Sequence, residues 1–159
     1  MKLFNWNWTG GDKMGGNPEV GSIQVKKINP SAKLPSKAHV TDAGFDLYAE
    51  KYSSIPAGET RLIGTGIAMT IPRGYAGLIW DRSSMGVKGL HRFGGVIDSD
   101  YRGEIKVCIH NASEESYTIS EGDKVAQLII QAAPSFFLKE VDSLEETERG
   151  GKGFGSSGI

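Results

Sequence analysis

Apolar and polar residues alternate over short segments of the chain, and turns rich in glycine and proline separate the segments. A repeat of two residues is typical of half-buried strands, and no long stretch repeats with the 3.6-residue period of a helix. The pattern predicts one short helix near residues 83–87 and strands over residues 23–28, 45–49, 61–71, 75–80, 104–109, 117–119, 124–130 and 136–141. Many short strands at this spacing indicate an all-β sandwich or barrel.

The composition changes on both sides of this strand-rich part. Residues 1–21 are rich in Gly and Asn and are expected to form a flexible N-terminal arm. This arm is either a disordered tail or a segment that docks Trp6 and Trp8 on an unknown partner. Residues 22–141 hold the predicted strands and form the predicted folded domain. Residues 142–159 are first acidic and then rich in Gly and Ser, which predicts a C-terminal arm that orders only against a ligand or a neighbouring subunit.

Length and charge narrow the possible classes of protein. A chain of 159 residues fits one domain, because domains usually hold roughly 100–200 residues. The formal net charge of −1 argues against a stable nucleic-acid partner, which would need a basic excess. No apolar run approaches the roughly 20 residues that a membrane helix requires. We found no leader-like apolar segment, so we expect an intracellular location, cytoplasmic or, in a eukaryotic or viral host, nuclear.

Cysteine and histidine give little support to a metal centre built by the protein. Cys108 is the only cysteine, which excludes an internal disulfide framework and a zinc site of several cysteines. His39, His91 and His110 are scattered along the chain. Glycine is the unusual residue, because 22 of 159 residues is about twice its ordinary share of roughly 7%. Glycine disfavours helices, so these residues are expected to serve turns, arms or a binding site.

Two glycine-rich blocks carry candidate chemistry. In residues 81–89, Arg82 stands beside two serines, and a guanidinium with hydroxyl and amide donors suits a phosphate. In residues 94–103, paired glycines precede Asp98, which follows two apolar residues and has the chemistry of a general base. Taken alone, each block is equally well interpreted as an ordinary polar turn or surface hairpin.

A third glycine-rich block lies in the C-terminal arm. Residues 153–158 match the spacing G-x-G-x-x-G. A dinucleotide site is excluded, because that motif needs a preceding strand, a following helix and an acidic residue about 20 positions later. The block instead favours a flexible clamp in which Arg149, Lys152 and serines bind phosphates and Phe154 covers a flat base. Together the three blocks indicate a nucleotide ligand.

Five segments in order carry a resemblance to a known family. They are residues 42–49, 82–86, 95–103, 122–129 and 149–158, and they resemble the five motifs of the trimeric deoxyuridine triphosphate nucleotidohydrolases, or dUTPases. The resemblance implies a jelly-roll-like β-sandwich of the dUTPase β-clip type, residues 22–141 being its catalytic domain. It also implies a homotrimer with a swapped C-terminal tail, residues 142–159, that closes over a neighbouring active site.

The activity implied by the resemblance is hydrolysis of dUTP to dUMP and pyrophosphate. Such a reaction limits uracil in DNA and supplies dUMP for dTMP synthesis. The implied cofactor is Mg²⁺, held mainly by the triphosphate, with Asp46 reaching it through water. Asp98 is implied to activate the water that attacks the α-phosphorus.

The resemblance also assigns substrate-binding residues. The phosphates are implied to contact Arg82, Ser83, Ser84 and Gln127. Uracil is implied to be read by main-chain groups of the hairpin Gly94, Gly95, Val96 and Ile97, while Tyr101 lies against the deoxyribose. Lys106 is counted among the substrate-binding residues. The closing tail is implied to contribute Arg149, Phe154, Gly155, Ser156 and Ser157, with Phe154 stacking on the base.

The sequence departs from the family pattern in three places. Asp81 precedes Arg82, where the family often has an uncharged or basic residue, and we expect it to pair with Arg82 or to weaken phosphate binding. Gly94 and Gly95 replace an Asn-containing loop, so the base contacts must come from the main chain. Gly86 stands where Ala is usual and is expected to loosen the short helix.

Two other functions are weighed against hydrolysis of dUTP. The first is dCTP deamination, which occurs on the same fold. It is disfavoured because Cys108 stands where deaminases have a catalytic Glu, and Tyr101 where they tend to have Trp. The second is a binding or capsid-like module without catalysis, which the complete set of five motifs disfavours.

Overall fold

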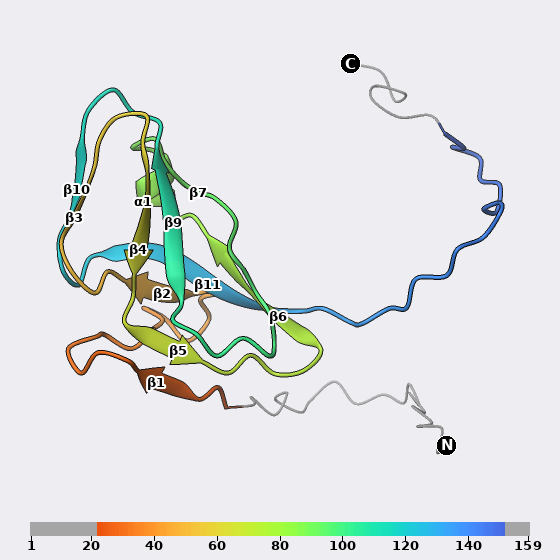
Figure 1. Cartoon of the computed structure of the whole chain (residues 1–159), viewed down its shortest axis with the longest axis horizontal. Coiled ribbons are helices and arrows are strands. Elements are labelled where there is room, and N and C mark those ends of the chain that lie inside the picture. Colours follow the sequence, from red (N-terminus) through yellow and green to blue (C-terminus); the bar gives the residue numbers. More distant parts are fainter. Residues whose placement is uncertain (1–21, 152–159) are drawn as a thin grey trace.

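The computed structural model describes residues 22–151 of the chain, so Trp6, Trp8 and residues 152–159 lie outside it. This part contains eleven strands and one short helix (Figure 1). The helix is α1, Ser83–Gly86. The strands are β1 Val25–Lys27, β2 Phe45–Tyr48, β3 Ser53–Ile55, β4 Thr60–Gly64, β5 Ile67–Met69, β6 Tyr75–Trp80, β7 Leu90–Arg92, β8 Val96–Ile97, β9 Lys106–Asn111, β10 Tyr117–Ile119 and β11 Lys124–Ala132. The predicted all-β class is confirmed.

The strands form two main sheets, and every pair of strands is antiparallel. One sheet has the order β2-β11-β6-β8, and the other has the order β4-β9-β7. Two-stranded ribbons, β1-β5 and β3-β10, complete the sandwich. In β9, buried positions alternate with more exposed ones, because successive side chains of a strand point to opposite faces.

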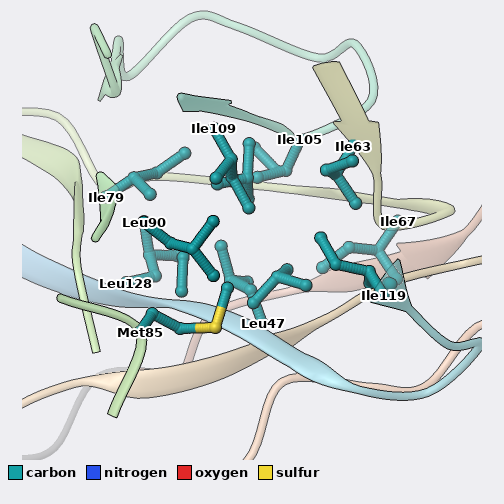
Figure 2. Close-up of a cluster of buried hydrophobic side chains, with 14 of the residues drawn as sticks. Leu47, Ile63, Ile67, Ile79, Met85, Leu90, Ile105, Ile109, Ile119 and Leu128 are labelled. Atoms are coloured by element: carbon teal, nitrogen blue, oxygen red, sulfur yellow. The ribbon is translucent and has the colours of Figure 1, made fainter. Parts of the chain in front are cut away.

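The core lies between the sheets and consists almost entirely of aliphatic side chains. Figure 2 shows Leu47, Ile79 and Leu128 of the four-stranded sheet in one cluster with Ile63 and Ile109 of the other sheet. All five side chains are at most 3% exposed. Such close packing of branched side chains fixes the relative position of the two sheets and therefore of the loops at their edges.

The strand predictions are mostly confirmed. The strands over 75–80 and 117–119 have the predicted bounds, and the helix near 83–87 is α1. The predicted strand over 61–71 is two strands, because Gly66 has φ of +66° and breaks the ladder. At this break the buried hydroxyl of Thr65 donates to the carbonyl of Ile105 at 2.5 Å. β3, β7 and β8 lie outside the predicted strand ranges.

The predicted strand over 136–141 is wrong. The last strand ends at Ala132, and residues 133–151 follow as an extended segment that runs away from the sandwich in Figure 1. Phe136 is 82% exposed and Phe137 is fully exposed, so the apolar pattern there does not face this protomer's own core. The apolar residues of this segment therefore do not mark a strand within this sheet. In the described part of the chain, no helix is long and apolar enough to cross a membrane.

Candidate active site

The register of the four-stranded sheet brings two of the five motifs into one row, beside the turn that carries a third. Gln127 on β11 lies opposite Asp46 on β2 and opposite Trp80 on β6. Residues that lie directly opposite one another in a sheet share a face. Asp46 and Gln127 therefore point to the same side, next to the turn that begins at Asp81. A register shift between Lys124 and Ala126 breaks the regular pairing of β11 with β2 beside this row.

The centre of this row is a carboxylate between two cations. Asp46 Oδ1 accepts a hydrogen bond from Arg82 Nε at 3.0 Å, and Asp46 Oδ2 pairs with Lys124 Nζ at 2.6 Å. The hydrogen bond and the charge of Asp46 raise the pKa of Lys124. These groups line a pocket of about 210 Å³ with Asp42, Ser83 and Gln127. Three donor side chains thus meet at one polar hollow, which is the chemistry of an anion site.

One hydrogen bond holds Gln127 in this pocket, and a glycine leaves room for its side chain. Its Nε2 donates to the main-chain carbonyl of Asp81 at 2.9 Å. A Cβ at Gly44 would lie 3.0 Å from Gln127 Oε1 and 3.2 Å from Gln127 Cβ. A side chain at position 44 would therefore crowd Gln127, which would have to shift by a few tenths of an ångström to admit it.

The turn after β6 presents the two serines. Arg82 is extended, with φ of −84° and ψ of 140°, and its carbonyl accepts from the amides of Met85 and Gly86. Met85 is buried and anchors the turn, while Ser83 and Ser84 are exposed. A Cβ at Gly86 would meet no atom within 4 Å, so nothing in the described protomer requires glycine there.

The expectation that Asp81 pairs with Arg82 is wrong. Arg82 is bound by Asp46, whereas the carboxylate of Asp81 faces β7. Asp81 Oδ1 accepts from the Arg92 amide at 2.7 Å, and Oδ2 lies 3.1 Å from His91 Nδ1. Main-chain geometry explains the result, because the side chains of consecutive residues in extended backbone point to opposite sides.

The hairpin predicted to read the base follows β7. Gly94 and Gly95 have φ of +69° and +102°, a region that favours glycine. The Gly95 carbonyl accepts from the Ile79 amide at 2.8 Å, and the Gly94 carbonyl accepts from Arg92 Nη1 at 2.6 Å. The loop is thus fixed by its own carbonyl groups, which already accept one hydrogen bond each. In the same hairpin, Val96 is 66% exposed.

Asp98 follows β8 and is exposed. It lines a second pocket of about 700 Å³ together with Arg73, Tyr75 and Asp100. Next to it, the Tyr101 hydroxyl donates to the Glu104 carbonyl at 2.9 Å. The sandwich therefore presents this carboxylate to a large polar hollow and does not bury it within the protomer.

Glycine also shapes the loop beside this second pocket. A Cβ at Gly103 would lie 2.6 Å from Cζ of Tyr101. Only glycine lets the phenol lie over the chain at this point, so the exposed face of Tyr101 remains directed outward.

One protomer keeps the two halves of the predicted site apart. β8 pairs with β6 so that Ile97 lies opposite Gly77, which places Asp98 level with Ala76. Arg82 is six positions further along the chain from Ala76, so about 20 Å separates it from Asp98 at roughly 3.3 Å per residue. The two residues also line different pockets. Asp98 and Arg82 therefore lie at separate places on the surface of one protomer.

The remaining predicted residues have different positions. Ile97 is half-buried and packs against the core, so only its main chain is available to a ligand. Lys106 begins β9 in the other main sheet and pairs with Glu104 at 3.3 Å, so it lines neither pocket. Arg149 lies in the segment that leaves the sandwich. The predictions for Phe154, Gly155, Ser156 and Ser157 lie outside the described residues.

Sequence reasoning assigned no role to two residues that line the anion pocket. Lys124 lies in the fourth motif, and its position after the turn Glu121-Gly122-Asp123 was a usable signal. Asp42 is the first residue of the first motif, and its carboxylate accepts from the His39 amide at 2.9 Å. This hydrogen bond lowers the pKa of Asp42. To assign Lys124 and Asp42 to the anion pocket required the strand register, because only the register brings the first and fourth motifs together.

The implied Mg²⁺ site does not fit a cage built by the protein. Mg²⁺ takes a nearly octahedral set of oxygen ligands. Among the described residues, no group of three or more His, Cys, Asp or Glu side chains is placed to hold a metal ion. Both oxygens of Asp46 are already bound to Arg82 and Lys124. Within the described residues, Asp46 is therefore not free to bind Mg²⁺ directly with either oxygen while it holds both cations.

Comparisons with known proteins identify the family of this chain. The dUTPase family model matches residues 30–158. A deoxyuridine 5'-triphosphate nucleotidohydrolase of Yarrowia lipolytica is 43% identical over 141 residues, which are 87% of this chain and 90% of that protein. The protein of the same name from a camelpox virus is 45% identical over 135 residues, which are 85% of this chain and 91% of the viral protein.

Solved structures show the same fold. A dUTPase of Staphylococcus bacteriophage 80alpha, solved with dUPNHPP, has a TM-score of 0.83 and is 33% identical, and the match covers 87% of this chain and 99% of that one. A dUTPase of phage phi11 of S. aureus, described with a structural Mg(II) ion, has a TM-score of 0.75 and is 29% identical, with 79% of this chain and all of that chain covered. The family match over most of the chain, the relatives above 40% identity and the shared fold show that this chain belongs to the dUTPase family.

Proposed function

We propose that this chain hydrolyses dUTP to dUMP and pyrophosphate, and so limits uracil in DNA and supplies dUMP for dTMP synthesis. The observation that carries the proposal is the anion pocket in which Arg82, Lys124 and Gln127 meet around Asp46. Membership of the dUTPase family and relatives named for this reaction support the choice of substrate.

The triphosphate is proposed to bind where the cations already gather. Arg82 offers a guanidinium fork, Gln127 offers an amide, and Ser83 and Ser84 offer hydroxyls at the exposed turn. Asp46 balances the charge of Arg82 and Lys124 before the substrate arrives. The incoming phosphates then compete for these donors, and the Asp46 contacts keep both side chains directed into the pocket.

Asp98 is proposed to accept a proton from the water that attacks the α-phosphorus. One O–H bond of the water breaks, the oxygen forms a bond to phosphorus, and the bond to the bridging oxygen breaks to release pyrophosphate. A carboxylate that faces a polar hollow next to exposed Tyr101 has the access that a water and a sugar need. Tyr101 is proposed to lie against the deoxyribose, and the main chain of residues 94–97 to read uracil.

Completion of the site is proposed to require a second copy of the chain. The separation of about 20 Å between Asp98 and Arg82 supports this step, because a water on Asp98 must reach a phosphate on Arg82. The exposed Phe136, Phe137 and Leu138 also support assembly, since such a run of apolar residues is normally covered. The proposed assembly is a homotrimer in which the C-terminal tail closes over a neighbouring site.

The tail and the metal ion complete the proposal. Arg149, Ser156 and Ser157 are proposed to close on the distal phosphates, Gly155 to let the chain approach closely, and Phe154 to stack on uracil. When bound, Mg²⁺ supplies charge neutralisation and orientation of the triphosphate. The ion would be held by the substrate, with Asp46 as a neighbour through water. We also propose an intracellular location, which suits a nucleotide substrate.

The direct test is pyrophosphate release measured side by side with dUTP, dCTP, dTTP and UTP. We expect release from dUTP and at most traces from the other three, because the pocket reads uracil and deoxyribose together. Release of ammonia from dCTP would instead identify a deaminase. No pyrophosphate from any deoxynucleotide, with a correctly folded protein, would favour the binding module.

A further inference from the structure

The unusual Asp81 connects two parts of the site. Its carboxylate accepts from the Arg92 amide at 2.7 Å and lies 3.1 Å from His91 Nδ1, so it binds the end of β7. Its own main-chain carbonyl accepts from Gln127 Nε2 at 2.9 Å. Asp81 thus connects two parts of the site. Its main chain contacts the anion pocket, and its side chain contacts the strand that leads into the hairpin.

Arg92 carries this connection into the hairpin. Its Nη1 donates to the Gly94 carbonyl at 2.6 Å, and its Cζ lies 4.8 Å from the centre of the Trp80 ring. Asp81 therefore holds the main-chain amide of Arg92, and Trp80 holds its guanidinium. Glycine loses more conformational freedom than other residues on ordering. A fixed neighbour such as Arg92 therefore contributes most to the ordering of Gly94 and Gly95.

We propose that Asp81 is a positioning residue that sets the base-reading hairpin through Arg92 and so contributes to the preference for uracil. The inference rests on the proposed function, because that function assigns base reading to residues 94–97. The carboxylate touches no group of the anion pocket, since both of its oxygens face β7. Its influence is therefore exerted on the base and not on the phosphates.

Two substitutions separate this role from a simple charge effect. Asp81→Ala removes the acceptor of the Arg92 amide, whereas Asp81→Asn removes the charge and keeps one acceptor oxygen. Glu59→Ala is the matched control, because it removes a carboxylate that pairs only with Arg61 at the surface. The measurements are the affinities of full-length protein for dUMP, dCMP and inorganic pyrophosphate, by calorimetry.

We expect Asp81→Ala to weaken dUMP binding about tenfold, to narrow the preference for dUMP over dCMP and to leave pyrophosphate binding unchanged. Asp81→Asn should stay within about twofold of the wild type, as should Glu59→Ala. Arg92→Met keeps the amide and removes the guanidinium, so it should reproduce the loss. If both Asp81 variants instead tighten pyrophosphate and leave dUMP binding unchanged, Asp81 acts as a repelling charge and the proposal is wrong.

Hydrogen exchange gives a readout that does not need the ligand. In Asp81→Ala, the amides of residues 92–95 should exchange faster, while those of β11 keep the protection of the wild type. Unchanged exchange at residues 92–95 would overturn the proposal. A general loss of protection in Asp81→Ala would show that this variant unfolds. The dUMP affinity of Arg92→Met then tests the proposal in its place. If the wild type does not prefer dUMP over dCMP, the proposed function fails, and exchange still tests whether Asp81 fixes the hairpin.

Discussion

Two variants that each destroy a different half of the active site are expected to restore activity when they assemble together. Arg82→Ala removes the guanidinium of the anion pocket, and Asp98→Asn removes the carboxylate that activates water. Within one protomer these residues are about 20 Å apart along β6 and β8, so neither protomer can complete its own site. A mixed assembly can combine the intact half of each variant.

The size of the recovery follows from random mixing. A site is intact only if its phosphate half comes from an Asp98→Asn protomer and its carboxylate comes from an Arg82→Ala protomer. At equal concentrations each condition is met half of the time, so about a quarter of all sites are intact in the randomly mixed population, and about one site in three in each trimer that contains both variants. Each variant alone should retain almost no turnover. The mixture should therefore show about a quarter of the wild-type rate per site.

The assay is pyrophosphate release from dUTP after the two variants are unfolded and refolded together. Different affinity tags on the variants allow the mixed assemblies to be isolated and their composition to be confirmed. Each variant refolded alone, and a mixture made without refolding, serve as controls. If isolated mixed assemblies are as inactive as the single variants, the division of the site between protomers is refuted.

Four further results are expected. Asp98→Asn should keep dUTP affinity while turnover falls about 100- to 10,000-fold, and turnover near the wild-type value would refute the role as base. Gly44→Ala places a Cβ 3.0 Å from Gln127 Oε1, so KM for dUTP should rise about tenfold with an unchanged melting temperature. Leu128→Ala in the core should cost about 3 kcal/mol in urea unfolding, and a loss below about 1 kcal/mol would contradict its place in the core. Removal of residues 149–159 should leave a folded trimer with poor turnover, and normal hydrolysis would exclude a clamp.

Most of the fold was predictable, because the two-residue alternation is a local signal. β10 shows it in the sequence Tyr-Thr-Ile, whereas β6 is a short apolar run bounded by turn residues, and the bounds of both strands were predicted correctly. β3 and β7 were missed because Ser53, Ser54, His91 and Arg92 are polar, and their pairing depends on distant partners. The segment 136–141 was wrongly predicted as a strand for the opposite reason. It is apolar, but its apolar residues have no partner in the described protomer.

The site was predictable in its residue types but not in its geometry. Arg82, Gln127 and Asp46 were selected from separate motifs, and only the register of β2, β11 and β6 shows that they share one pocket. The role of Asp81 could not be inferred from its neighbour Arg82. In extended backbone consecutive side chains point to opposite sides, so adjacency in sequence was the wrong guide.

The arrangement of this protomer makes assembly and catalysis depend on the same contacts. A single copy exposes the apolar side chains of Phe136, Phe137 and Leu138 and also holds Asp98 too far from Arg82 to act on one phosphate chain. Covering the apolar segment favours association, because burial of apolar surface is the main driving force between subunits. In the proposed homotrimer, the same association would place the hairpin of a second copy beside the anion pocket. An isolated protomer would therefore be able to bind phosphates but not to cleave them, so hydrolysis would be confined to the assembled protein, where each site is closed and fully equipped.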